Sequence, residues 1–578
     1  MNARTMVREL SEELAIGLVL RDENRKGLAA ICAETEIALK DDPITQGLLD
    51  EQFAILKPLL RMFREPEADP RASGKDDDVK RLRFAVDDLL AVLEKSYFRK
   101  LCEALREAIG HENQDAVRKL TTALLSDLTD QGWDLASLHR WHRHFMSMKK
   151  KRAYSFGENL SFMLRQMMRG QQPFDVVLRL SGSERLAEVD RFGEFSVTAA
   201  PPPSVPPEEG GRFSLPHRLA RYARTTVEAV DFLPAALKAR ESCEKQLDLL
   251  RFDYERRIVK IDDRCCVTRE GDQKVVFATV GLTVPNPVED IDREGFDSFT
   301  KSVDYVCNHS RVEEASRVQL QAAIRQYRFG RDSASYQDMF LNWWMGLEGL
   351  AHVGRGKGIG FTVTRNVSRV MAISSFSRIL RDLQMTLKYC QAAWSGQLVD
   401  ISGCQGPDDL TIMGLVSLLQ SQRGAELLAE QCRPNPVLAY RVGWIGGWMQ
   451  DTQKAADRYG AHLRYVEWHL QRIYRIRCCI VHGAPVRYRL GLIAANLEFY
   501  LKQTILFALK VFHNNGHVRN LEDLYERASI ASDQVLAGLT NPSSDARDDG
   551  LRAIRDAVFA GAVTEASAMT LPDTDAGC

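Results

Sequence analysis

An arginine and a histidine five positions apart are the residues of this chain whose types and spacing best suit chemistry. They lie in the stretch 474–483, where four apolar residues separate Arg477 from His482. Histidine moves protons near neutral pH, and arginine holds a phosphate with a fixed fork of donors and keeps its charge. Such a pair can cleave RNA without a metal ion. The apolar residues predict the end of a buried helix, which Gly483-Ala484-Pro485 then stops.

The residues around this pair favour a polyanion as the binding partner. Between positions 464 and 489 the chain has one acid, Glu467, and six arginines, which are Arg464, Arg472, Arg475, Arg477, Arg487 and Arg489. Arginines grip phosphates and aromatic rings stack on unpaired bases. We therefore predict that substrate is contacted by Arg472, Arg475, Tyr474 and Arg487. The alternative is that Trp468 and Tyr474 are core residues, as aromatic residues on helices usually are.

The same segment resembles the motif of HEPN domains, a family of helical ribonucleases built around an arginine, a few variable residues and a histidine. The resemblance continues upstream, where residues 322–327 and 336–350 are similar to the glutamate-bearing helical part of the defence-associated branch. Downstream, residues 491–512 are similar to the closing helix of the family. The resemblance covers roughly residues 316–518, and Cys478 stands where many members have a polar residue, often asparagine.

The resemblance implies a homodimer in which Arg477 and His482 of both chains face one cleft. The implied reaction is attack by the substrate's own 2′-hydroxyl on the neighbouring phosphorus. His482 would move a proton, and Arg477 would offset charge on the phosphoryl oxygens. No metal or other cofactor takes part, the products carry a 2′,3′-cyclic phosphate and a 5′-hydroxyl, and DNA is spared because it lacks that hydroxyl.

Glu348 is the third candidate catalytic residue. It lies in a very apolar stretch, residues 343–350, and a buried carboxylate requires a partner. The resemblance implies that Glu348 pairs with an arginine or histidine of the motif helix and positions it. The alternative is an acid that faces solvent.

Composition and charge limit the classes of protein to which this chain can belong. The chain has 578 residues, of which 45% are hydrophobic and 27% charged, and its net charge is −1. These values predict roughly two to four domains, with nucleic-acid contacts confined to local patches. The twelve cysteines form no Cys-x-x-Cys pair, which favours reduced buried thiols over a zinc site. No signal core or apolar run of roughly 20 residues is present, so we expect a soluble cytoplasmic protein.

The spacing of apolar residues predicts a mainly α, multidomain protein. Residues 1–195 are predicted to form an N-terminal helical sensing or regulatory domain. A Pro-rich linker is predicted over 196–215, because five of the seven residues in 201–207 are proline. The nuclease-like helical bundle spans 316–518.

Two further regions complete the predicted organisation. Residues 216–315 are predicted to form an α+β connecting region that is helical over 217–251. This region also carries a β-hairpin or small sheet near 255–290, because two β-branched runs flank Gly271-Asp272. Residues 519–578 are predicted to form a C-terminal extension with two helices and a disordered end.

Two other motifs have both a functional and a structural interpretation. In residues 354–360, Arg355 and Lys357 stand between alternating glycines, whose backbone N–H groups can form a nest for an anion. We predict that both side chains touch the RNA backbone; the alternative is a mobile connection between helices. Residues 139–152 carry three histidines among basic residues. Their spacing completes no metal site, and the run is either a surface for nucleic acid or an acidic partner, or a solvated helix face.

These observations predict a regulated, metal-independent endoribonuclease. The resemblance suggests anti-phage defence by abortive infection, with a phage-derived trigger or a regulatory protein as a partner beside the RNA substrate. One alternative is a non-catalytic helical module that binds a nucleotide or a protein. Another is a toxin controlled by a separate antitoxin. We expect neither a metal nor a membrane to take part.

Overall fold

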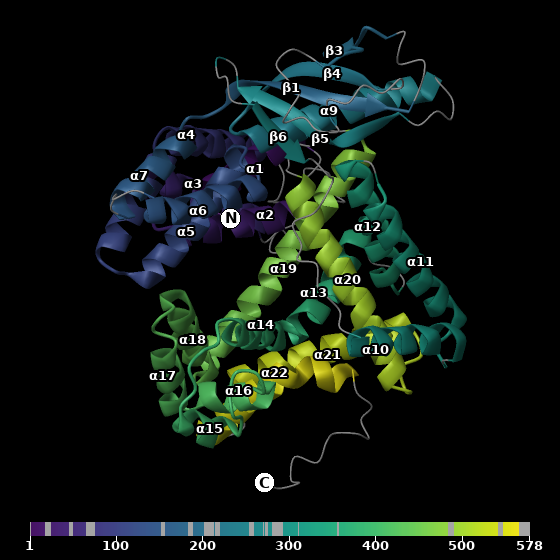
Figure 1. Ribbon diagram of the computed structural model, residues 1–578. Helices are drawn as coiled ribbons and strands as arrows, with labels where there is room; N and C mark the ends of the chain where they lie inside the picture. The colour runs from purple at the N-terminus through teal and green to yellow at the C-terminus, as the bar shows by residue number, and fades with distance from the viewer. Residues whose placement is uncertain are drawn as a thin grey trace. The chain divides into compact units, whose positions relative to one another are not determined.

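Helices make up most of this protein, as expected for the predicted mainly α class, which is confirmed (Figure 1). The chain divides into two compact units: unit 1 comprises residues 1–285 with 334–336, and unit 2 comprises 286–333 with 337–578. The computed structural model describes residues 2–17, 25–45, 50–64, 76–151, 156–182, 189–201, 213, 220–253, 259–269, 271, 275–279, 293–309, 311–333, 335–354, 358–483, 490–541 and 547–565.

Unit 1 begins with seven helices, which are α1 (Ala3–Ile16), α2 (Arg25–Asp41), α3 (Asp50–Arg64), α4 (Asp76–Gly110), α5 (Gln114–Gln131), α6 (Leu135–Lys151) and α7 (Phe156–Met167). They enclose one apolar core to which α1 contributes Met6, Val7 and Leu10. Asn2 caps α1 by accepting a hydrogen bond from the Thr5 N–H, and this satisfies a backbone donor that the helix leaves open.

A buried polar network holds the first turn of α1 in place. The Tyr97 hydroxyl donates to Asp42 Oδ2 at 2.5 Å, and the Ala3 N–H donates to the same oxygen at 3.0 Å. Arg4 forms an ion pair with Asp127, 2.8 Å away, and both side chains are buried. Because unpaired polar groups are costly in a protein interior, these bonds fix how α1 packs against α2, α4 and α5.

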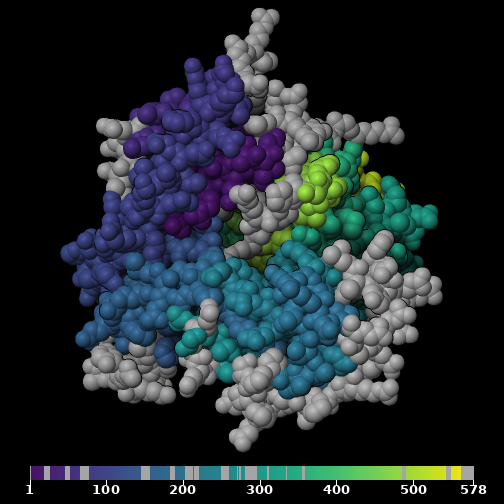
Figure 2. All heavy atoms as spheres, turned by 90° about the horizontal axis from the view of Figure 1, so that it is seen from above, coloured from purple at the N-terminus to yellow at the C-terminus, as the bar shows by residue number. Residues whose placement is uncertain are grey.

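The rest of unit 1 is a six-stranded antiparallel sheet with one long helix. The strands are β1 (Gln172–Ser181), β2 (Arg191–Phe192), β3 (Phe195–Thr198), β4 (Arg221–Ala229), β5 (Lys260–Arg269) and β6 (Val275–Thr279), in the order β2-β3-β4-β1-β5-β6. Helix α9 (Phe232–Asp253) packs on one face of the sheet. It contacts a core that includes Phe174, Val176 and Leu178, which occupy every second position of β1 and therefore point to the same face. The strands and α9 appear as one block of blue and teal atoms in Figure 2.

This sheet overturns part of the predicted organisation. Residues 1–195 are not wholly helical, because β1, β2 and part of β3 precede position 196. The predicted helix over 217–251 is also wrong at its start, where β4 carries the β-branched run Thr225, Thr226 and Val227. The predicted Pro-rich linker, 196–215, does not separate domains. It joins β3 to β4, which pair with each other (Thr198 opposite Tyr222); residues 202–212 and 214–219 lie outside the described part.

The predicted β-hairpin is present, although it belongs to a larger sheet. Strands β5 and β6 pair antiparallel, with Cys265 opposite Ala278, and Gly271 between them has a φ of +76°. That left-handed backbone conformation is one that glycine adopts without strain. The predicted connecting region, 216–315, is in fact divided, because its strands and α9 belong to unit 1 and its last residues to unit 2.

All regular elements of unit 2 are helices in its described residues. Its elements are α10 (Arg293–Asp304), the π-helix η5 (Tyr305–His309), α11 (Glu314–Arg331), α12 (Tyr336–Ala351), α13 (Ile359–Ile373), α14 (Ser375–Tyr389), α15 (Gly396–Ser402), α16 (Ile412–Gln420), α17 (Gln422–Gln431), α18 (Pro436–Met449), α19 (Thr452–Val481), α20 (Leu490–Asn514), α21 (Leu521–Thr540) and α22 (Arg547–Glu565). The helices predicted around 336–350 and 491–512 are therefore formed, as α12 and α20.

The long helix α19 organises unit 2. Asp451 caps its start by accepting from the Lys454 N–H, and the helix packs against α13, α18, α21 and α22. Helices α21 and α22 also pack against α13, so these two helices of the predicted C-terminal extension, 519–578, belong to the same bundle. The disordered end predicted for that extension falls on residues 566–578, outside the described part.

Within the described residues, α20 is the one helix long and apolar enough to cross a bilayer. However, 61% of its most apolar window is buried inside the fold, and Leu497, Leu501 and Ala508 are core residues. A central helix of a large bundle has this character, since apolar residues are needed on most of its faces.

Candidate functional site

His482 lies at the surface, directly after the last residue of α19. Its backbone N–H donates to the Cys478 carbonyl at 3.0 Å, and Gly483 follows with a φ of +67°. This left-handed glycine ends the helix, as predicted, while residues 484–489 lie outside the described part. Val481, His482 and Gly483 are all exposed, so the imidazole can meet a ligand from solvent.

Arg477 stands on the final turns of α19 and is partly exposed. On a continuous helix, side chains five positions apart point about 140° away from each other. Here the helix ends between them, because His482 already has the backbone angles of a cap, with φ −91° and ψ 7°. The His482 N–H still makes the helical hydrogen bond to the Cys478 carbonyl, so the imidazole can approach Arg477 only through its own side-chain rotamer.

Helices α12, α13 and α19 converge around Tyr474, one turn before Arg477. The Tyr474 ring lies against Trp344, with 5.8 Å between ring centroids, and fits over Gly360 at the start of α13. Burial raises the pKa of the Tyr474 phenol to about 12; the neighbouring Cys478 thiol and the charge of Glu348 also raise that pKa, whereas Arg477 lowers it. The charges of Glu348 and Arg477 therefore both act on the Tyr474 phenol.

Glu348 has a different partner from the one predicted. Its carboxylate accepts a hydrogen bond of 2.6 Å from the indole N–H of Trp344, one turn earlier on α12. In the described part of the chain, Glu348 forms no ion pair with Arg477 or His482, so the predicted pairing is wrong. The buried indole needs an acceptor and the carboxylate is within reach on the same helix face, which explains why this bond forms.

The prediction that Arg472 and Arg475 contact substrate is also wrong. Both side chains are only 5% exposed, on a helix that packs against α13, α18, α21 and α22. The charge of Arg472 acts inside the fold, where it contributes to lowering the pKa of His469. Tyr474 is partly buried and its ring packs against Trp344. This is the core role that was given above as the alternative for Tyr474. The remaining predicted contacts, Arg487, Arg355 and Lys357, lie outside the described residues.

The basic run of the first unit is a partly solvated helix face. His139, His142 and Arg143 on α6 are exposed, and Arg140 forms an ion pair of 2.6 Å with Asp231. Across the described residues, no three side chains of histidine, cysteine, aspartate or glutamate are arranged to hold a metal ion.

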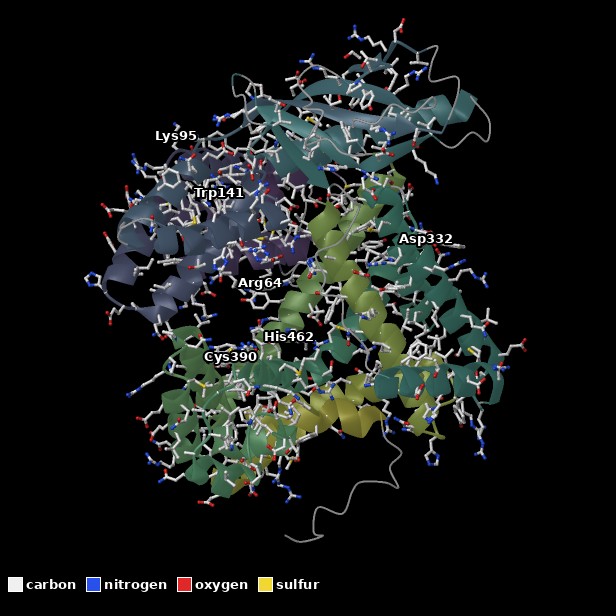
Figure 3. The ribbon with its side chains drawn as sticks, viewed as in Figure 1. Arg64, Lys95, Trp141, Asp332, Cys390 and His462 are labelled. Atoms are coloured by element: carbon white, nitrogen blue, oxygen red, sulfur yellow. The ribbon has the colours of Figure 1, made fainter. Side chains whose placement is uncertain are left out.

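Two partly buried histidines on α19 are features that the sequence interpretation missed. Burial, together with the charges of Arg378 and Arg458, lowers the pKa of His462, labelled in Figure 3, to about 4. Burial also lowers the pKa of His469 to about 3, and its Nδ1 lies 3.0 Å from the Tyr500 hydroxyl. Their separation of seven positions places both on one side of the helix, and this spacing was the available signal.

Mild acid is expected to destabilise unit 2 through these histidines. Their folded pKa values lie below the ordinary 6.5, so the neutral rings stabilise the fold above pH 6.5, and this stability is lost as the pH falls toward 4. Between pH 7.5 and 5.5 we expect a loss of about 1 kcal/mol per histidine. Urea unfolding followed by tryptophan fluorescence measures it. The variant His462→Gln/His469→Gln should lose much of this pH dependence; an unchanged dependence would refute the explanation.

Gly360→Ala is expected to displace Tyr474. A Cβ on Gly360 would lie 2.7 Å from Cδ1 of the Tyr474 ring, and Trp344 lies against that ring. We expect a loss of about 1–3 kcal/mol of stability from this overpacking, measured as a lower urea midpoint. Gly349→Ala on α12 is the matched control, because nothing lies within 4 Å of its new methyl group. Equal midpoints for the two variants would contradict this packing.

Comparison of this chain with protein-family models, with curated proteins and with solved structures finds no match.

Proposed function

We propose that this chain is a metal-independent endoribonuclease of the HEPN type. The observation that carries the proposal is the exposed His482 at the end of α19, following a partly exposed Arg477 beside Tyr474 and Glu348. This is a proton-transfer group and a permanent cation on the same terminal segment of one helix. Together they supply what transesterification by a 2′-hydroxyl requires.

Each residue of the site has a distinct role in the proposed reaction. The 2′-oxygen attacks phosphorus, and the bond from phosphorus to the 5′-oxygen breaks. His482 takes the proton from the 2′-hydroxyl or gives one to the leaving 5′-oxygen, and the second copy of the residue in a homodimer would serve the other step. Arg477 holds the phosphoryl oxygens as their charge grows. Glu348 and Tyr474 act as positioning residues, through Trp344 and through packing beside Arg477.

The proposal extends to the biological setting. An unrestrained ribonuclease would be toxic to its host, and unit 1 offers many residues outside the nuclease for restraint or for sensing a trigger. We propose a cytoplasmic enzyme that acts in anti-phage defence by abortive infection, activated by a phage-derived or regulatory partner. This role rests on the resemblance of the motif segments to the defence-associated branch.

Incubation of the purified full chain with total RNA in EDTA tests the proposed activity. The proposal expects cleavage that resists the chelator, with 2′,3′-cyclic phosphate and 5′-hydroxyl ends. Arg477→Ala and His482→Ala should abolish it. Cleavage that requires a divalent cation, or that both variants retain, would overturn the proposal.

A second candidate is a non-catalytic module that binds a nucleotide or a protein. The burial of Arg472 and Arg475 favours it, since it reduces the cationic surface offered to a long RNA. This candidate predicts no cleavage in the same assay. A toxin controlled by an antitoxin would instead arrest growth on expression, and a neighbouring gene product would relieve the arrest.

A further inference from the structure

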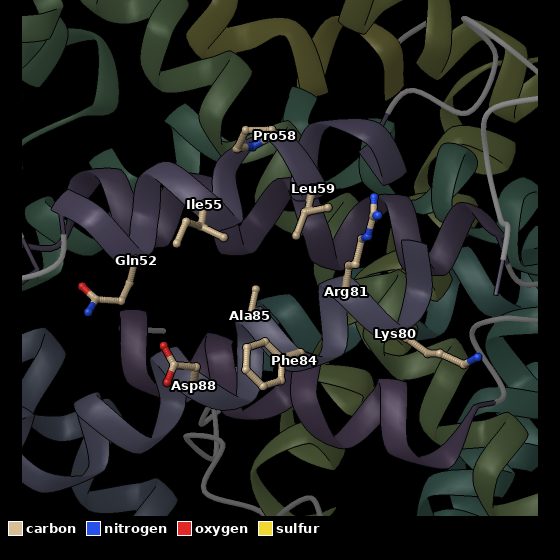
Figure 4. A pocket seen from close by; sticks show the side chains of 9 residues that line it. All are labelled: Gln52, Ile55, Pro58, Leu59, Lys80, Arg81, Phe84, Ala85 and Asp88. Atoms are coloured by element: carbon tan, nitrogen blue, oxygen red, sulfur yellow. The ribbon is translucent and has the colours of Figure 1, made fainter. Parts of the chain in front are cut away.

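An open apolar groove runs between α3 and α4 in unit 1. Its volume is about 550 Å³, and it is lined by Gln52, Ile55, Pro58, Leu59, Lys80, Arg81, Phe84, Ala85 and Asp88 (Figure 4). Two of its large apolar side chains are strongly exposed, Phe84 at 76% and Ile55 at 65%. Both lie on long helices whose opposite faces carry the core residues Leu56, Leu60, Leu82 and Val86. The groove is therefore formed by well-anchored elements.

The apolar surface continues along α3 at helical spacing. Met62, seven positions after Ile55, is 38% exposed, and Pro58 is exposed between them. Exposed apolar side chains that gather on one face and are bordered by charges are typical of a surface that meets another protein. A single exposed phenylalanine would not by itself indicate a binding surface. Here a row of exposed apolar side chains on α3 lies across the groove from Phe84 on α4.

The two ends of the groove carry opposite charges. Figure 4 shows Lys80 and Arg81 at one end and Asp88 at the other, with Phe84 between them. Seven to eight residues of α4 separate these charges, which corresponds to about 11–12 Å along the helix axis. Lys80 has a loose contact of 3.6 Å with the exposed Asp77, Arg81 has one of 3.9 Å with Asp78, and Asp88 forms no ion pair among the described residues. Such exposed contacts are worth little and exchange easily.

We propose that this groove binds the same groove of a second copy of the chain. A two-fold axis close to Phe84, in the first third of α4, places the basic end of one groove opposite the acidic end of the other. Lys80 and Arg81 of each protomer then face Asp88 of its partner, in two equivalent contacts. Phe84 of one protomer lies near the axis and fills the groove of the other, beside Ile55, so that both α3–α4 pairs form a four-helix contact.

This self-complementary charge pattern is the reason for choosing a second copy as the occupant. A groove with a single sign of charge would repel its own copy, whereas opposite charges at opposite ends attract under a two-fold rotation. The inference does not depend on the nuclease proposal. That proposal concerns α19 in unit 2, and the surface on α3 and α4 is separate from it in the chain.

A charge-exchange experiment on the full chain tests the dimer surface. Sedimentation equilibrium gives the association state of the wild type, of Lys80→Glu/Arg81→Glu and of Asp88→Lys. Each variant alone places like charges opposite each other at both contacts, so its dissociation constant should rise at least tenfold. Mixed in equal amounts, the two variants should associate with each other, because both contacts of the mixed pair join opposite charges. Phe84→Asp should weaken association in every combination.

Two outcomes would overturn the proposal. One is a monomeric wild type, which would leave the groove to a different protein. The other is association that is the same for the wild type, both charge variants and their mixture, which would place the contact elsewhere on the chain. Circular dichroism of each variant checks that its helices are intact, because an unfolded variant would also fail to associate. RNA cleavage plays no part in this readout.

Discussion

Replacement of His482 by alanine is expected to reduce RNA cleavage at least ~10³-fold, which is within the range that a positioned proton-transfer group contributes. His482 is exposed at the end of α19, so removing the ring leaves the packing of the bundle unchanged. Cleavage of a labelled oligoribonucleotide in EDTA, with the purified full chain, measures the effect. Arg477→Ala should have an effect of similar size, because it removes the charge that stabilises the phosphoryl oxygens.

Matched variants make this prediction specific. His517→Ala removes another exposed histidine of unit 2 and should leave cleavage unchanged. Arg477→Lys keeps the charge but loses the two-pronged fork, so we expect activity between that of the wild type and that of Arg477→Ala. If His482→Ala and His517→Ala cut RNA equally fast, His482 is not the proton-transfer group and the proposed mechanism is wrong.

Gly330→Ala is expected to destabilise unit 2 strongly. A Cβ at this position of α11 would lie 2.3 Å from Nε1 of Trp343 and 2.5 Å from its Cδ1. Trp343 is fully buried, and its indole N–H donates to the Tyr327 carbonyl at 3.0 Å. The ring therefore cannot move without losing both its packing and its hydrogen bond. We expect a loss of about 3 kcal/mol or more.

Urea unfolding followed by tryptophan fluorescence measures this loss. The control is Gly443→Ala on α18, whose added methyl group meets nothing within 4 Å; alanine there should be neutral or slightly stabilising, because it favours helix over glycine. A Gly330→Ala protein as stable as Gly443→Ala would mean that α11 and α12 are packed less closely than described here.

The sequence predicted the helices of unit 2 better than the sheet of unit 1. The resemblance identified the helices that are α12 and α20, and the two helices predicted after position 519 are α21 and α22; each of the four buries apolar residues over several turns. Strand β1 was missed, since Val177 contacts one face of the sheet while Val176 and Leu178 contact the other, and this burial on both sides removes the alternation that marks a strand. The proline run was mistaken for a boundary between domains, although it joins two neighbouring strands.

The candidate site was predictable only where its residues are close in the sequence. The motif segment gave His482 at a helix end, and Gly483 as the residue that ends it. Burial could not be read from the same segment, because it depends on which helices cover α19; Arg472 and Arg475 therefore looked like surface cations. The bond between Glu348 and Trp344 has a visible signal, a spacing of four positions, that the interpretation overlooked.

The central claim is that the substrate's own 2′-hydroxyl cleaves RNA at the Arg477 and His482 site. The most direct measurement compares two oligoribonucleotides in EDTA, identical except for one 2′-deoxyribose on the 5′ side of the cleaved bond. We predict that cleavage of that bond falls at least ~10³-fold, while the unmodified RNA gives a 2′,3′-cyclic phosphate end. Cleavage of the deoxy-containing bond at the wild-type rate, leaving a 5′-phosphate, would contradict the account.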